Sequence, residues 1–95
     1  MLRLLLFCEY VIPEANRAAF AEWVKTAPER WEGVELLENA GQPGVFVEIR
    51  RPGDRAEAAD MEKERREGRS WREMENLAKG DREGVRIWLF VPADL

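Results

Sequence analysis

Apolar and polar positions alternate along LRLLLFCEYVI, residues 2–12, with the period of two that is typical of a β-strand. One face of this strand is apolar throughout, as expected of a face that packs against a core. The other face carries Arg3 and Glu9 among large apolar side chains, which suits neither solvent nor a dry core. The pattern therefore predicts a strand and leaves open what its second face contacts.

The next segment changes to the period of a helix. Pro13 cannot continue a ladder of strands, but proline is common at the start of a helix. Apolar residues between Phe20 and Trp31 then recur at steps of three and four. Pro28 interrupts this pattern, so we expect an amphipathic helix to about Lys25 and a short turn after it.

The middle of the chain predicts a hairpin, and the remainder predicts helices and a last strand. Two strand-like runs, residues 34–39 and 44–51, flank the turn sequence AGQPG. Asp54 is expected to cap the helix RAEAADMEKERRE, whose mixed charges are typical of a solvated surface. A second helical piece, WREMENLAK, precedes a final strand over residues 84–91.

The order strand, helix, strand, strand, helix, strand is that of the α+β ferredoxin-like (βαββαβ) fold. Ninety-five residues make one domain, residues 1–95. We therefore expect a four-stranded antiparallel sheet with its helices on one face. By alternation, the predicted helix-facing residues are Leu2, Leu4, Leu6, Val34, Leu36, Val45, Val47, Ile49, Val85, Ile87, Leu89 and Val91. Cys8 shares their face of the first strand and is expected to be a small buried apolar residue.

The opposite face is predicted to be apolar as well, which points to a partner. Its predicted members include Leu5, Phe7, Glu9, Leu37, Phe46, Glu48, Arg50, Arg86, Trp88 and Phe90. Monomeric soluble proteins usually avoid such a large apolar patch. A second copy packed face to face would cover it, so we expect a homodimer in which the two sheets form an α/β barrel.

The charges on this predicted inner face have two interpretations. Glu9, Glu48 and Arg86 leave adjacent strands and are expected to cluster, as ion pairs that fix the dimer or as the polar end of a ligand site. In the second interpretation these three are candidate catalytic residues. The predicted apolar wall of the ligand site is formed by Phe7, Phe46, Trp88 and Phe90.

Composition excludes several functional classes. The net charge of −4 argues against a general nucleic-acid or membrane-surface binder. No apolar run is long enough to span a bilayer, so a cytoplasmic protein is expected. There is no glycine-rich phosphate loop and no Cys/His metal spacing, so we expect neither a cofactor nor a metal.

The segments EYVIPEANRAAFAEWV, VFVEIRRPGDRAEA and VRIWLFV together resemble the dimeric α/β-barrel superfamily, in particular its antibiotic-biosynthesis-monooxygenase-like members and related small uncharacterised proteins. The resemblance implies a barrel dimer with a ligand pocket, and it would place Trp71 near the mouth of that pocket. The haem-degrading members use a histidine on the second helix, and this chain has no histidine. Haem degradation by that route is therefore not expected.

The resemblance leaves two function classes open. One is a cofactor-independent, monooxygenase-like enzyme that acts on an apolar or aromatic small molecule. The other is a non-catalytic module for ligand binding, regulation or assembly. The sequence does not decide between them, because its motifs specify the fold better than the chemistry.

Overall fold

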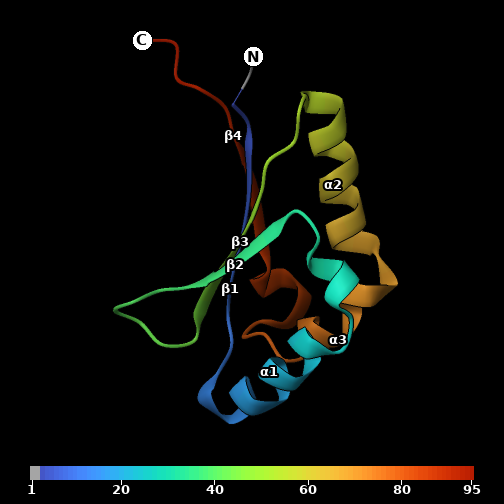
Figure 1. The fold of residues 1–95 in the computed structure, drawn as a ribbon. Coiled ribbons are helices and arrows are strands. Elements are labelled where there is room, and N and C mark those ends of the chain that lie inside the picture. The colour runs from blue at the N-terminus through green and yellow to red at the C-terminus, as the bar shows by residue number, and fades with distance from the viewer. Residues whose placement is uncertain (1–2) are drawn as a thin grey trace.

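The computed structural model describes residues 3–95 and confirms an α+β fold with the predicted order of elements. Its four strands form one antiparallel sheet in the order β2-β3-β1-β4. The strands are β1 Leu5–Val11, β2 Val34–Glu38, β3 Val45–Arg50 and β4 Arg86–Phe90. The helices are α1 Arg17–Lys25, α2 Arg55–Glu67 and α3 Arg72–Glu75, and all lie on one side of the sheet (Figure 1). This arrangement is consistent with a ferredoxin-like fold.

Local sequence explains where the helices begin and end. Asp54 caps α2 as predicted, because its carboxylate accepts a hydrogen bond of 2.8 Å from the backbone N–H of Glu57. The helix predicted over WREMENLAK is shorter in the structure, where a 3-10 turn leads into the four residues of α3. The chain then turns through Gly80 and Asp81, both with positive φ, to reach β4.

The core lies between the sheet and the helices. Tyr10 of β1 packs edge-to-face against Phe20 of α1, with ring centroids 5.9 Å apart. The buried cluster contains Leu6, Cys8, Tyr10, Ile12, Phe20, Trp23, Trp71, Met74, Ala78, Val85 and Ile87. Cys8 is therefore a buried core residue, as predicted. No helix within residues 3–95 is long and apolar enough to cross a membrane.

The register of β3 corrects the faces that the sequence predicts for this strand. Cys8 lies directly opposite Glu48, and Tyr10 lies opposite Phe46. Residues directly opposite in an antiparallel pair point to the same side of the sheet. Glu48 and Phe46, with Arg50 at the same parity, therefore face the helices, and their predicted position on the other face is wrong.

The same register moves the valines and isoleucine of β3 to the side away from the helices. Val45, Val47 and Ile49 lie opposite residues of β1 that also point away from the core, so their predicted helix-facing position is wrong as well. The predicted faces of β1, β2 and β4 agree with the register. Leu2 lies outside the described residues, and Val91 lies beyond the end of β4, where it is exposed.

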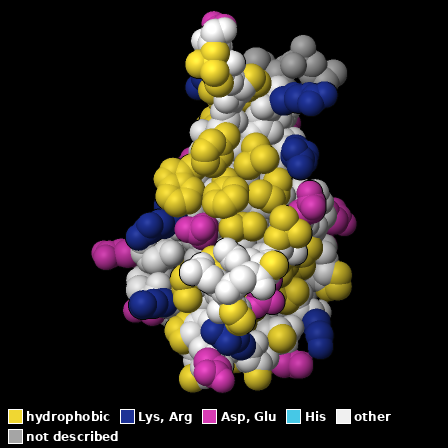
Figure 2. All heavy atoms as spheres, turned by 90° about the vertical axis from the view of Figure 1, so that its left-hand side faces the viewer, with side chains coloured by type: hydrophobic (Ala, Val, Ile, Leu, Met, Phe, Trp, Pro, Cys, Tyr) yellow, Lys and Arg dark blue, Asp and Glu magenta, His cyan; other side chains and the backbone are white. Residues whose placement is uncertain are grey.

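The side of the sheet that carries no helix, which we call the open face, is broadly apolar (Figure 2). Trp88 and Phe90 are 42% and 54% exposed there, and Phe7 packs against both. The open face consists of Leu5, Phe7, Glu9, Val11, Glu35, Leu37, Val45, Val47, Ile49, Arg86, Trp88 and Phe90. It is more apolar than the sequence predicts, because β3 contributes aliphatic residues in place of two charges.

Candidate functional site

A carboxylate lies at the centre of the helix side of the sheet. Glu48, in β3, is 0% exposed. Its oxygens accept hydrogen bonds from Tyr10 Oη at 2.6 Å and from Arg50 Nη1 at 2.8 Å. Arg65 of α2 donates two more, from Nε at 2.7 Å and from Nη2 at 2.9 Å. These four side chains form a buried ion cluster that ties β1 and β3 to α2.

The ion cluster keeps Glu48 ionised. Burial is the largest single influence on its pKa and would raise it. The attraction and hydrogen bonds of Arg65, the charge of Arg50 and the hydroxyl of Tyr10 together outweigh burial and hold the pKa below the usual value of 4.5. One carboxylate thus faces two guanidinium groups, so the cluster carries one excess positive charge.

Trp71 lies over both guanidinium groups. The Cζ atom of Arg65 is 4.2 Å from the centroid of its ring, and that of Arg50 is 5.1 Å away. The indole Nε1–H donates to the carboxylate of Glu64 on α2, at 3.0 and 3.1 Å. The ring is therefore held at a fixed angle between α2 and the sheet.

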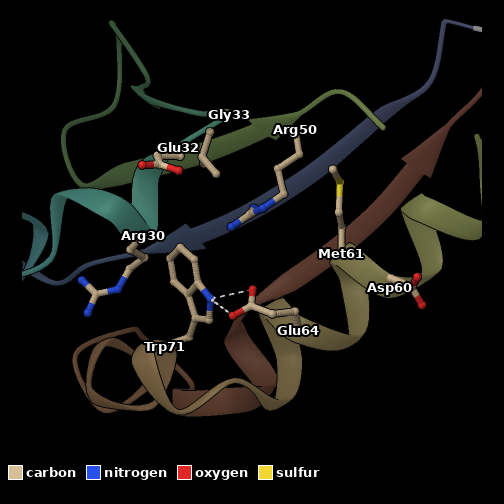
Figure 3. A pocket seen from close by; sticks show the side chains of 9 residues that line it. Arg30, Glu32, Gly33, Arg50, Asp60, Met61, Glu64 and Trp71 are labelled. Carbon is tan, nitrogen blue, oxygen red and sulfur yellow. Dashed lines mark hydrogen bonds between the residues drawn. The ribbon is translucent and has the colours of Figure 1, made fainter. Parts of the chain in front are cut away.

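A cavity of about 330 Å³ opens beside this indole (Figure 3). Its buried floor is formed by Arg50 and Trp71, which point toward each other in Figure 3, and its rim carries exposed acidic residues. We call it the Trp71 cavity, and its lining residues are Arg30, Glu32, Gly33, Val34, Arg50, Asp60, Met61, Glu64 and Trp71. The volume is in the range of small-molecule sites.

The floor of the Trp71 cavity contains an unused hydrogen-bond donor. Arg50 is 5% exposed, and its Nη2 atom is buried without a partner in the part of the chain that the structure describes. Buried polar groups are nearly always hydrogen-bonded, so an unpartnered guanidinium nitrogen requires an explanation. An acceptor atom of a bound molecule would satisfy it.

The other reactive side chains near the cluster are not poised for proton transfer near neutral pH. Burial, reinforced by the charge of Glu48, raises the pKa of the Cys8 thiol to about 12. Burial and then Glu48 also raise the pKa of the Tyr10 hydroxyl well above 10.0. The cluster is thus suited to holding a charged or polar group electrostatically rather than to acid–base exchange.

The structure separates the predicted catalytic candidates. Glu9 and Arg86 are directly opposite each other on the open face, and they form no ion pair within residues 3–95. Glu48 points to the other side of the sheet, where Arg65 provides the counter-charge. The predicted cluster of Glu9, Glu48 and Arg86 is therefore not formed in this chain.

The predicted aromatic wall is divided in the same way. Phe7, Trp88 and Phe90 contact one another on the open face. Phe46 lies on the helix side, 4.7 Å from the ring of Phe20, where it fills the core. Trp71 is buried at the floor of a cavity on the helix side of the sheet, whereas the resemblance placed it near the mouth of a pocket inside the barrel.

Sequence reasoning missed Arg65 and Tyr10 as members of the site. Arg65 is 1% exposed although it lies in a segment that resembles a solvated charged helix. One signal was present: Ala58, Met61 and Arg65 recur at steps of three and four, which puts Arg65 on the inward face of α2. A charge in such a position needs a buried partner.

No group of three or more His, Cys, Asp or Glu side chains in residues 3–95 is arranged to hold a metal ion. Comparison of the chain with protein-family models, curated proteins and solved structures found no match.

Proposed function

We propose that this protein binds a small molecule with an apolar or aromatic body in the Trp71 cavity. The observation that carries the proposal is the buried, unpartnered Nη2 atom of Arg50 at the cavity floor. The indole of Trp71 and the aliphatic side chains of Val34 and Met61 provide apolar surface around it. A few polar groups within a mostly apolar pocket are typical of ligand sites.

Filling the cavity tests its role as the binding site. The Met61→Trp variant adds a large ring at the cavity wall, so we expect it to weaken binding of small aromatic molecules by about tenfold or more. Binding is measured by titration calorimetry with phenylacetate, phenylacetamide and hydroquinone. The Ala59→Trp variant is the control, because Ala59 is exposed on the same helix. Equal affinity of wild type and Met61→Trp would place binding elsewhere.

We also propose that two copies pair through the open face to form a barrel. Soluble monomers seldom expose a contiguous apolar patch of this kind, and the half-buried Val45 and Val47 of β3 enlarge it. A second copy related by a two-fold axis would cover it with an equally apolar surface. The Trp71 cavity lies on the opposite side of the sheet, so such a dimer would leave it accessible.

Catalysis remains a separate proposal about the same cavity. An arginine beside an aromatic ring could hold the oxygen of an electron-rich phenol, which suits the cofactor-independent oxygenation that the family resemblance implies. Oxygen uptake with hydroquinones separates the two function classes. Uptake that is lost in Met61→Trp would support an enzyme, whereas binding without uptake would support a ligand-binding or regulatory module.

A further inference from the structure

We infer that the ligand of the Trp71 cavity is a monocarboxylate, held by a hydrogen bond from Arg50 Nη2 to one of its oxygens. This inference rests on the proposed function, because it specifies the chemistry of the molecule that enters the same cavity. Three observations support the inference: the excess positive charge of the ion cluster, the occupied acceptor positions of Glu48, and the acidic residues at the rim of the cavity.

The buried charge of the ion cluster is unbalanced. Arg50 and Arg65 carry two positive charges, and within residues 3–95 Glu48 carries the one negative charge that pairs with them. Buried charges in proteins are nearly always compensated, because removing an ion from water is costly. A bound anion next to Arg50 would bring the cluster to neutrality.

Glu48 cannot accept the remaining donors. An ionised carboxylate offers about four acceptor positions. Glu48 already accepts four hydrogen bonds, two on each oxygen. The indole N–H of Trp71 is likewise engaged, since it donates to Glu64. Two donors of the cluster, Arg50 Nη2 and Arg65 Nη1, are buried without a partner within residues 3–95, and of these two arginines only Arg50 lines the cavity. The acceptor for Arg50 Nη2 must therefore come from outside the cluster.

The rim restricts the charge of the anion. Glu32, Asp60 and Glu64 line the cavity, and all three are exposed. Solvent and salt weaken the effect of these carboxylates at the buried floor. A second negative charge on the ligand would lie outside the floor, close to the carboxylates, and would be repelled by them. Arg30 also lines the cavity. Its guanidinium stacks on Trp23 at 4.2 Å, and its Nε is a second buried donor without a partner in the part of the chain that the structure describes. The arrangement therefore favours a monoanion over a phosphate or a dicarboxylate.

The geometry further favours a planar acid with an apolar or aromatic body. A carboxylate matches the planar guanidinium of Arg50, as it does in paired arginine and carboxylate side chains. The body of the ligand would then lie along the indole of Trp71 and the side chain of Met61. Arylacetic acids are simple probes with this shape.

The test compares each acid with its neutral amide. We expect phenylacetate and indole-3-acetate to bind the full chain about tenfold to a hundredfold more tightly than phenylacetamide and indole-3-acetamide, as measured by titration calorimetry at neutral pH. The Arg50→Met variant should reduce the affinity for the acids to that for the amides. It leaves Glu48 paired with Arg65, so the remaining ion pair is balanced.

The matched control is Arg51→Met, because Arg51 is the exposed neighbour of Arg50 in the sequence. It should leave the affinity for the acids unchanged. Equal affinity of acid and amide for the wild type would overturn the inference while leaving a neutral aromatic site intact. Absence of binding by acids and amides alike would contradict both the inference and the proposed function. The comparison of acid with amide needs no variant, so it holds even if Arg50→Met fails to fold.

Discussion

Glu48→Gln should lower the free energy of unfolding by about 3–5 kcal/mol, because it leaves two buried guanidinium groups without an anion. Glutamine keeps the size of the side chain, so the loss reports on charge rather than on packing. Urea denaturation followed by circular dichroism measures the effect. A domain of this size is stable by about 5–15 kcal/mol, so the variant should be close to its limit of stability.

The matched control is Glu22→Gln on α1, away from both the cluster and the open face. Glu22 is exposed and lies 3.9 Å from Lys25, an arrangement that contributes about 0–1 kcal/mol. If Glu48→Gln fails to fold, Tyr10→Phe is a milder substitute, since it removes one of the four hydrogen bonds and should cost about 1–2 kcal/mol. A Glu48→Gln variant as stable as the Glu22→Gln control would contradict the buried ion cluster.

The pH dependence of the stability difference between wild type and Glu48→Gln provides an independent check. The pKa of Glu48 is lower in the folded protein than its usual value of 4.5. Its contribution is therefore complete above that value and is lost as the pH falls toward the folded pKa. The stability difference between wild type and Glu48→Gln should shrink below about pH 4.5 and stay constant above it.

Trp88→Glu should dissociate the proposed dimer. The substitution places a carboxylate on the edge strand β4, beside Phe7 of the open face, and a two-fold axis brings it into the interface twice. An unpaired buried charge costs about 3–5 kcal/mol, which corresponds to a dissociation constant raised by about a hundredfold or more. Light scattering should give twice the chain mass of 11.0 kDa for the wild type and a single mass for the variant.

The control for this substitution is Ala19→Glu, on the exposed side of α1. It adds the same charge away from the open face and should leave the mass unchanged. A wild-type protein that is monomeric at micromolar concentration would end the dimer proposal. A Trp88→Glu variant that stays dimeric would show that the copies pair through another surface.

The order of strands and helices was predictable from the sequence because each element carries its own signal. Alternation identified the strands, and proline, glycine and Asp54 marked the ends of elements. The faces of β1 and β4 were also predictable, since apolar residues there share a parity with the core. These are local features, and they need no knowledge of what packs against them.

The orientation of β3 was not predictable in this way. Three consecutive apolar residues, Val45 to Val47, are compatible with either orientation of β3. The prediction of which face points toward the helices therefore depended on Glu48 and Arg50. Charged residues are rarely buried unless they are paired, which favoured the outward assignment. The pairing residue is Arg65, 17 positions away in α2, and only the tertiary structure brings it to the strand.

The candidate site lies on the helix side of the sheet because the faces of β3 are the reverse of those predicted. The sequence indicated that an arginine, a glutamate and aromatic residues would meet inside a barrel, whereas Trp71 lines a cavity on the helix side of the sheet. The predicted side of the sheet was wrong for Phe46, Glu48 and Arg50, because it depended on the parity of a single strand. The unpartnered donor of Arg50 depends on exact atomic positions, which no pattern of residue types can specify.

The central claim is that ligands bind over Trp71 on the helix side rather than on the open face. The four tryptophan indole N–H signals in a ¹H–¹⁵N correlation spectrum, assigned with single Trp→Phe variants, report on both sides of the sheet. On titration with phenylacetate, we predict that the Trp71 signal shifts and the Trp88 signal does not. A shift of Trp88 with Trp71 unchanged would contradict the account and place the ligand on the open face.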